Sequence, residues 1–411
     1  MQKKLIFPLI FGVVLSLLIA QEAEEKRPDD LKNSAIVVKN VTNFFDDTQP
    51  LVASFEPRYI HTVAWSPDGK FLLIDRNFPS LGHSLEKIPF PYTGEIIHLT
   101  PRRDGKNRLN FSNPTWTPDG KGIVFVGQNH ENPTATKDSL PPYALASNLC
   151  YITASGKNMQ QLTRIRSSYS VLNGGVSPRF SPDGKKLFWT KSTQSKNSTS
   201  LWGERELCIG NFTIKEDGTP ALTKIRSFTP AKGSTAYYES YGFSPDGTKI
   251  LYCSNLNLDQ QWVTADIVSQ DFNPETNLPE GEPVVLTKFP DVWDRYATWS
   301  PNGKKIIWSS SAGFLISFLG LGGAQWQQAM RSELWVMNSD GSDCQRLTSF
   351  NYKNTPFYMG GACYVGMSAW HPDGKHLAVL VHKAYKLTEV STALLLIELG
   401  DAYSTPAPPK Q

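Results

Sequence analysis

Residues 179–190 read RFSPDGKKLFWT, and this stretch decides the fold. Phe180 ends a short strand-like run, Ser-Pro-Asp-Gly follows, and an apolar run from Leu187 leads away. In a tight turn, proline presets the backbone at the second position, aspartate suits the third and glycine suits the fourth. The stretch therefore predicts a β-hairpin, and the aromatic side chain before its turn should point into a core.

The same pattern recurs along the whole chain. Its six turn prolines each have an aromatic residue two positions earlier; they are Pro67, Pro118, Pro182, Pro245, Pro301 and Pro372. Most copies are followed by a third and a fourth strand-like run, as in residues 333–337 and 345–348 after the fifth copy. Four antiparallel strands in a repeating unit are typical of a propeller. We therefore predict an all-β, six-bladed β-propeller of four-stranded antiparallel blades.

The composition agrees with a large all-β protein. Of the 411 residues, 30 are glycine and 29 are proline, while charged residues make up 19%. This mix excludes a coiled coil, a long helical bundle and a highly charged disordered chain. Lys and Arg number 41 against 38 Asp and Glu, which gives a formal charge of +3. That excess is too small for the basic surface of a nucleic-acid binder, so we expect no nucleic-acid partner.

The amino terminus has the pattern of an export signal. Lys3 and Lys4 precede an apolar run over residues 5–20, which is short for a membrane span. We expect residues 1–20 to be a signal peptide, with an uncleaved membrane anchor as the alternative. The chain would then be exported, and periplasmic or extracellular.

The other boundaries follow from the repeats. Residues 59–400 form the predicted propeller, and residues 401–411 are expected to be a disordered tail. The stretch after Pro372 offers a second and a third strand but no outer one. We therefore expect residues 21–58 to supply the strand that closes the ring, since an open ring would leave unpaired edges.

The five cysteines leave at least one thiol unpaired within the chain. Cys150, Cys208 and Cys253 lie in apolar runs, so we interpret them as buried small side chains. Only Cys344 and Cys363 lie in loop-like sequence, and a bridge is considered for that pair alone.

The repeat resembles that of a known family. Residues 299–307 read WSPNGKKII, residues 334–341 read LWVMNSDG, and RLT follows shortly after. Over residues 60–399 this pattern is similar to the β-propeller repeat of the TolB type, which also has relatives in prolyl peptidases. The resemblance implies an exported propeller that mainly binds other proteins or envelope components. Residues 21–58 leave no room for the amino-terminal α/β domain of TolB itself, so the role in the Tol–Pal system is not carried over.

Motifs that would indicate catalysis do not occur in the sequence. There is no GxSxG, the nucleophile motif of the hydrolase domain in prolyl peptidases, and no HExxH zinc motif. The seven histidines are scattered, and His371, which replaces the turn serine of the sixth copy, is interpreted as part of a surface turn. We therefore expect no metal and no cofactor, and favour a protein that is not an enzyme.

Candidate binding residues lie where the predicted strands face the channel or enter the ring. Residues one and three positions before each turn aromatic should face the channel, because side chains alternate along a strand. In the channel the candidates are Arg179, Asn113 and Tyr296, and at the strand entrances they are Glu239, Tyr241, Trp293, Asp294 and Arg295. Aromatic side chains beside carboxylates and arginines suit a sugar or a peptide. They equally suit ordinary packing between blades.

Residues 311–326, SAGFLISFLGLGGAQW, interrupt the fifth copy with a long apolar, glycine-rich stretch. Phe314, Leu315, Phe318 and Leu319 are candidates for contact with a partner or a membrane. The alternative is that the stretch folds back over the propeller.

These features lead to one favoured function and one alternative. We predict an exported, non-catalytic β-propeller that binds or scaffolds a protein or a cell-envelope component. The alternative is a propeller enzyme or lectin that acts on a glycan or a peptide at the ring face.

Overall fold

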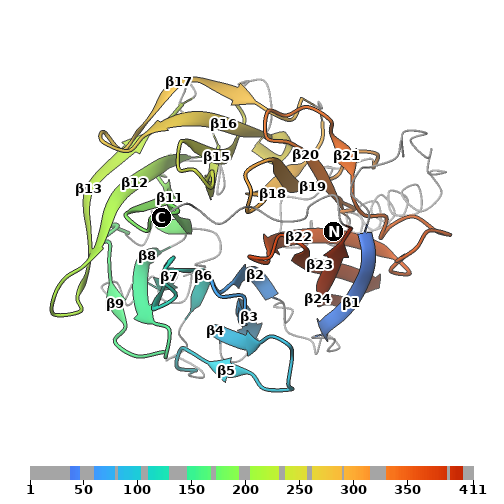
Figure 1. The fold of residues 1–411 in the computed structure, drawn as a ribbon, viewed down its shortest axis with the longest axis horizontal. Helices are drawn as coiled ribbons and strands as arrows, with labels where there is room; N and C mark the ends of the chain where they lie inside the picture. The colour runs from blue at the N-terminus through green and yellow to red at the C-terminus, as the bar shows by residue number, and fades with distance from the viewer. Residues whose placement is uncertain are drawn as a thin grey trace, which may run out of the picture.

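The structure is a computed structural model of the chain. It describes residues 38–46, 60–78, 82–102, 110–128, 146–167, 173–193, 204–230, 237–256, 262–288, 291–314, 330–386 and 389–400. Within these ranges the strands form six antiparallel four-stranded sheets, arranged as blades around a ring (Figure 1). The predicted all-β, six-bladed propeller is therefore confirmed. Its described residues contain one short 3-10 helix, Trp262–Thr264.

In each of the first five blades the chain runs outward from the ring centre, so that sequence order and spatial order agree (Figure 1). Blade one comprises β2 (Ile60–Trp65), β3 (Phe71–Phe78), β4 (Gly82–Pro89) and β5 (Ile97–His98). Blade two comprises β6 (Phe111–Trp116), β7 (Gly122–Gln128), β8 (Ser147–Thr153) and β9 (Gln160–Gln161). Blade three comprises β10 (Gly175–Phe180), β11 (Lys186–Ser192), β12 (Arg205–Ile214) and β13 (Pro220–Phe228). Blade four comprises β14 (Tyr238–Phe243), β15 (Lys249–Ser254), β16 (Asp266–Asn273) and β17 (Leu278–Val285). Blade five comprises β18 (Asp294–Trp299), β19 (Lys305–Ser310), β20 (Glu333–Asn338) and β21 (Gln345–Arg346).

Blade six takes its strands from both ends of the described chain. Three come from the carboxyl end, β22 (Ala362–Trp370), β23 (His376–Lys386) and β24 (Glu389–Leu399), and the outer one is β1 (Val38–Asp46). β1 runs antiparallel to β24, from Val38 opposite Leu399 to Asp46 opposite Ala393. The ring is thus closed by hydrogen bonds between segments more than three hundred residues apart.

The turn that follows each inner strand has a local cause. In blade one the Ser66 hydroxyl donates to Asp68 Oδ1 at 2.7 Å and accepts the amide of Phe71 at 2.9 Å. Gly69 completes the turn with φ +71°, a conformation that favours glycine. Blades two to five repeat the hydroxyl contact, with Asn302 in place of aspartate in blade five.

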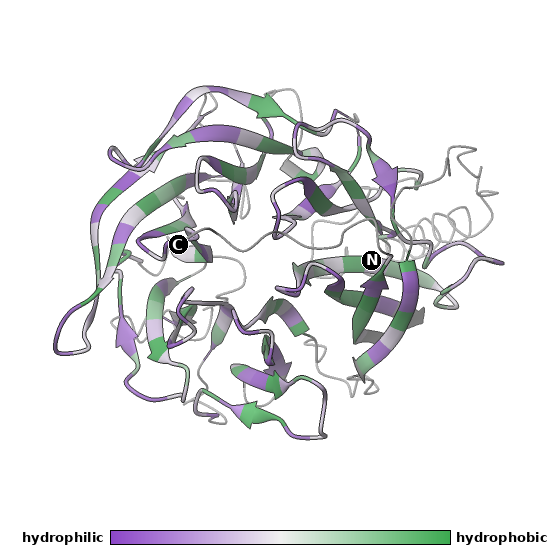
Figure 2. Ribbon diagram, viewed as in Figure 1, coloured by the Kyte–Doolittle hydropathy of each residue, from purple (hydrophilic) through white to green (hydrophobic). Residues whose placement is uncertain are grey.

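The cores lie between neighbouring blades. Leu73 and Leu85 of blade one, for example, cluster with Phe111 and Trp116 of blade two. Figure 2 shows hydrophobic residues along the strands and hydrophilic ones gathered at the turns. All five cysteines are free thiols, so the bridge considered between Cys344 and Cys363 is not formed.

Every inner strand departs from regular pairing with the second strand of its blade, as at a β-bulge. The register between the first and second strands shifts within β2, β6, β10, β14, β18 and β22. A bulge changes which face the following side chains occupy. The regular alternation that we assumed for the channel is therefore interrupted in all six blades.

In the part of the chain that the structure describes, no helix is long and apolar enough to cross a membrane. The predicted signal peptide, residues 1–20, and the predicted tail, residues 401–411, lie outside the described residues.

Candidate binding site at the channel

Arg179 lies at the end of β10 and is half-buried. Its Nη1 donates to the carbonyl of Pro178 at 2.8 Å, and its Nη2 lies 3.9 Å from the sulfur of Met367. Met367 belongs to β22 of blade six, which stands opposite blade three in the ring (Figure 1). The arginine side chain therefore reaches across the channel.

Glu239 on β14 is the acidic counterpart of this arginine. Its Oε2 accepts the hydroxyls of Tyr237 at 3.1 Å and Tyr241 at 3.4 Å, and its side chain is 12% exposed. Burial lowers the pKa of Arg179, while the nearby Glu239 and Tyr241 act in the opposite direction. The sequence candidates Arg179, Glu239 and Tyr241 thus lie within electrostatic reach of one another.

The two phenols are held in their neutral form. Burial raises the pKa of Tyr237 and of Tyr241, and the negative charge of Glu239 raises both further. At neutral pH these hydroxyls therefore stay protonated and act as hydrogen-bond donors, not as nucleophiles.

Arg295 on β18 packs between blades four and five. Its side chain is 3% exposed, its Nε lies 3.9 Å from Glu239 Oε2, and its guanidinium stacks 4.9 Å from the Tyr237 ring centre. Nη1 approaches the Cys253 sulfur at 2.8 Å and donates to the carbonyls of Asp294 and Ala265. Burial raises the pKa of Cys253 to about 12, so this thiol is not a reactive thiolate.

Asp294 does not join Glu239. Its Oδ1 accepts the indole N–H of Trp308 at 2.9 Å within blade five, and the residue is fully buried. Burial raises the pKa of this carboxyl to about 6. Among the described residues, Asp294 Oδ1 thus bonds Trp308 and Glu239 Oε2 bonds Tyr237 and Tyr241, with no hydrogen bond between the two carboxyl groups.

Asn113 and Tyr296 both lie in bulges, with φ of +51° and +58°. Asn113 is fully buried. Its backbone N–H donates to Asp75 Oδ2 at 3.0 Å, and its side-chain Oδ1 accepts the hydroxyl of Ser177 at 3.3 Å. It therefore links blades one, two and three.

Tyr296 is half-buried and accepts the hydroxyl of Tyr364 at 3.0 Å. The ring of Trp293, a residue only 1% exposed, stands edge-on to Tyr296 at 5.6 Å. These aromatic side chains pack blade five against blade six.

The candidate contact segment is described only at its start. Phe314 packs against Tyr352, with ring centres 5.4 Å apart. Leu315, Phe318 and Leu319 lie outside the described residues, so contact with a partner or a membrane stays a prediction.

One group of side chains was not predicted from the sequence. His371, Asp373 and His376 come together at the turn between β22 and β23. The signal was present as the string HPDGKH, in which two histidines flank the repeated turn aspartate. Interpreting His371 as a simple serine replacement overlooked the second histidine.

Comparisons with known proteins find distant structural likenesses only. No protein-family model and no curated protein matches the chain. Similar solved structures include a protein assigned as TolB from Agrobacterium tumefaciens, with 14% identity, a TM-score of 0.47, and coverage of 83% of this chain and 91% of that one. An oligogalacturonate lyase in complex with manganese shows 12% identity, a TM-score of 0.47, and coverage of 89% and 99%. Prolyl oligopeptidase B from Galerina marginata shows 14% identity, a TM-score of 0.46, and coverage of 81% and 40%.

At these values the similarities carry no argument about activity, substrate or partner. The strand order itself shows the six-bladed propeller that the sequence repeats predict.

Proposed function

We propose that the chain is an exported, non-catalytic β-propeller that binds a protein or a cell-envelope component at the channel face carrying Arg179 and Glu239. One observation carries the proposal. Among the residues that the structure describes, the Arg179 guanidinium contacts only the Pro178 carbonyl and the weakly accepting Met367 sulfur. A guanidinium has five N–H donors, so several remain for carbonyl or carboxylate oxygens of a ligand.

The surroundings of Arg179 favour binding over catalysis. The phenols of Tyr237 and Tyr241 stay protonated, the Cys253 thiol has a raised pKa, and Asp294 is turned to Trp308. A nucleophile within reach of a general base is the usual requirement for covalent catalysis. Tyr237, Tyr241, Cys253 and Asp294 do not supply that pair.

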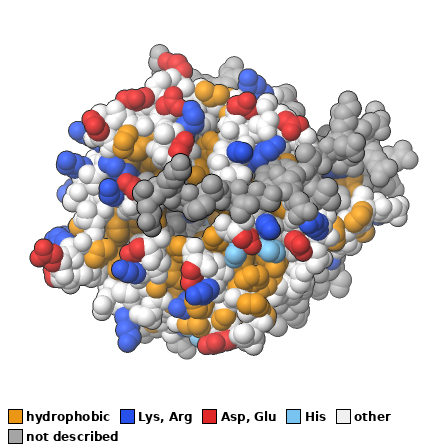
Figure 3. Space-filling view, viewed as in Figure 1, with side chains coloured by type: hydrophobic (Ala, Val, Ile, Leu, Met, Phe, Trp, Pro, Cys, Tyr) orange, Lys and Arg blue, Asp and Glu red, His pale blue; other side chains and the backbone are white. Residues whose placement is uncertain are grey.

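The shape of the partner follows from the position of the arginine. Because Arg179 reaches across the channel, a ligand contacts it from the channel mouth, as a loop or chain end of a protein would. Acidic and basic side chains are interspersed over the face in Figure 3, which suits a site of local charge complementarity.

The test is affinity capture from a native envelope fraction with the immobilised chain. Arg179→Ala should lose the captured component, and Lys185→Ala, an exposed cation on the turn of the same blade, should retain it. Equal capture by Arg179→Ala and the parent chain would exclude the channel face as the binding site.

Two further measurements address the finer parts of the proposal. Fractionation of cells with mass determination of the mature amino terminus should find the chain exported and cleaved near residue 20, and an intact cytoplasmic chain would exclude export.

Incubation with glycans and peptides should give no turnover. Turnover that disappears in Glu239→Gln would favour the enzyme alternative.

A further inference from the structure

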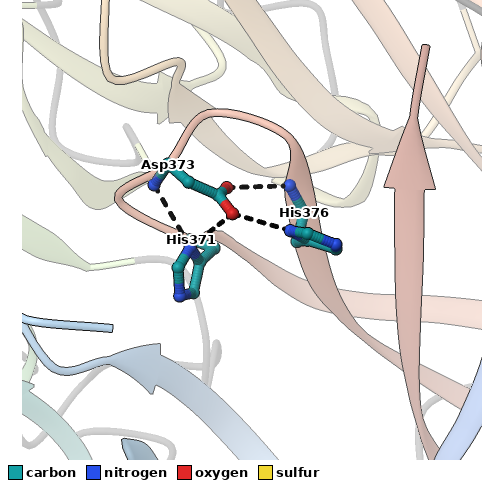
Figure 4. A group of neighbouring side chains, drawn as sticks. All are labelled: His371, Asp373 and His376. Atoms are coloured by element: carbon teal, nitrogen blue, oxygen red, sulfur yellow. Dashed lines mark hydrogen bonds and ion pairs between the residues drawn. The ribbon is translucent and has the colours of Figure 1, made fainter. Parts of the chain in front are cut away.

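The turn between β22 and β23 gathers three potential metal ligands. The nitrogen and oxygen atoms that His371, Asp373 and His376 offer all lie within 4.8 Å of one another. Asp373 Oδ2 is 3.0 Å from His371 Nδ1 and 2.7 Å from His376 Nδ1, so the carboxylate stands between the two rings (Figure 4).

The carboxylate is held in place by its other oxygen. Asp373 Oδ1 accepts the backbone amides of Lys375 at 2.7 Å and His376 at 3.1 Å. These bonds leave Oδ2 directed at the two imidazoles. The orientation of this ligand is therefore set before any ion arrives, which lowers the cost of binding one.

The His371 ring is oriented from the neighbouring blade. Its Nε2 lies 3.2 Å from the carbonyl oxygen of Gly69, which can only accept, so Nε2 carries the hydrogen. Nδ1 accepts the backbone amide of Asp373 at 3.1 Å and lies 3.0 Å from Asp373 Oδ2, so an ion bound at Nδ1 would take the place of that amide hydrogen bond. A hydrogen bond from the second ring nitrogen to a backbone carbonyl is usual for metal-bound histidine.

The other five turns show that the fold does not need these histidines. At the position of His371 they have Ser66, Thr117, Ser181, Ser244 and Ser300. At the position of His376 they have Phe71, Gly122, Lys186, Lys249 and Lys305. In their turns a serine or threonine hydroxyl makes the side-chain contact that the histidines make here. Two histidines therefore flank the turn aspartate only in the sixth copy, although four of the other copies also have that aspartate.

The site is partly open to water and is bordered on one side by aromatic rings. The side chains of His371, Asp373 and His376 are 14%, 33% and 28% exposed. Trp65 stands edge-on to His371 with ring centres 4.6 Å apart, and Phe90 lies 5.7 Å from the same ring. Figure 3 shows histidine side chains beside an acidic one on this face, over β2 and β23. An ion can thus enter from water while one side of the site stays apolar.

We propose that His371, Asp373 and His376 bind one divalent transition-metal ion, and that Zn²⁺ fits this donor set best. Two imidazole nitrogens and one carboxylate oxygen are usual zinc ligands, whereas Ca²⁺ and Mg²⁺ prefer oxygen ligands only. In a tetrahedral site with Zn–N distances of about 2.0–2.1 Å, ligand atoms lie about 3.3 Å apart. The two carboxylate–imidazole distances, 3.0 Å and 2.7 Å, need to open by only a fraction of an ångström, and a fourth position stays open to water or a ligand.

The bound ion would act on the seam of the ring. The Gly69 carbonyl and the Trp65 and Phe90 rings belong to blade one or its edge, while the three ligands belong to blade six. Trp65 also donates its indole N–H to the Ala369 carbonyl across this seam. Ordering His371 by metal therefore strengthens the contact between the first and last blades.

The test is calorimetric titration of the full, EDTA-treated chain with ZnCl₂. The parent chain should bind about one ion with a thermal midpoint that rises on addition. His371→Ser and His376→Lys restore residues found in the other copies. Each should weaken zinc binding by at least about 10-fold, because even the loss of a residue that only supports a metal ligand weakens binding by that factor. His98→Gln removes a histidine that faces the single carboxylate of Glu86, and it should bind zinc as the parent does.

Failure of the parent chain to bind zinc at micromolar concentrations would overturn the proposal, and so would unchanged affinity in both variants. Crystals of the parent chain soaked in ZnCl₂ provide a measurement that does not depend on folded variants. An anomalous peak bonded to His371, Asp373 and His376 is expected, and zinc elsewhere alone would refute the site.

Discussion

Asp294 accepts a hydrogen bond from the indole of Trp308, with Nε1 2.9 Å from Oδ1, and both residues have no exposed surface. A carboxyl group in this position is costly to ionise, because the charge loses its hydration. The pair therefore makes the stability of blade five depend on pH.

Burial raises the pKa of Asp294 from 3.8 to about 6, so the folded chain binds more protons than the unfolded chain between those values. Stability should then fall as pH rises through that window, by up to about 3 kcal/mol for a shift of this size. Asp294→Asn keeps an acceptor for Trp308 and has no charge to bury. Urea unfolding at pH 4 and pH 7 should show a smaller decline in this variant, and parallel declines in both proteins would contradict the assignment.

Glu239→Gln should destabilise the fold by about 1–3 kcal/mol. The substitution leaves the buried guanidinium of Arg295 without its nearby negative charge, and two phenols lose a charged acceptor. Asp271→Asn breaks the exposed pair with Lys249 and is the matched control. Because exposed pairs contribute at most about 1 kcal/mol, the control should change the free energy of unfolding much less. Equal losses in the two variants would argue against a buried charge network.

Gly69→Ala should lower the thermal midpoint more than Gly218→Ala does. Both glycines have positive φ, +71° and +81°, so both variants incur a left-handed penalty of about 1–2 kcal/mol. A Cβ at Gly69 would also lie 2.3 Å from His371 Nε2, whereas a Cβ at Gly218 would meet nothing within 4 Å. Calorimetric melts compare the two directly. The same midpoint for both variants would mean that the contact between blades one and six is looser than the structure has it.

Val41→Asp should destabilise the ring, and Thr42→Asp should have little effect. Val41 packs on the core between blades five and six, while its neighbour on β1 is exposed. An unpaired carboxylate at this half-buried position of β1 loses the apolar packing and part of its hydration, at a cost of roughly 1–3 kcal/mol. Denaturant unfolding is the measurement. A Thr42→Asp variant as unstable as Val41→Asp would show that charge on the strand, and not lost packing, is responsible.

The fold could be predicted because its determinants are local and repeated. Each Ser-Pro-Asp-Gly turn closes by contacts among neighbouring residues, such as the one between Ser66 and Asp68. Every copy of the motif therefore predicts the same hairpin. The ring then follows from counting copies, and adjacency of Glu239 and Arg295 follows from adjacent blades.

The orientation of side chains near the channel could not be predicted in the same way. Asn113, Ser177 and Tyr296 adopt positive φ within bulges, although none of them is a glycine whose presence would have marked the place. The bulge in β18 falls between Arg295 and Thr298, so alternation counted back from Trp299 fails before it reaches Asp294. Asp294 therefore faces Trp308, whereas Glu239 on β14 faces Arg295.

The pairing of Val38 with Leu399 has a consequence for how the protein is made. β1 pairs with β24, which follows it by more than three hundred residues of chain. Blade six therefore cannot assemble until β24 has been synthesised, after the strands of the other five blades. Closure of the ring is thus a late event in folding, since contacts this distant in sequence are slow to form.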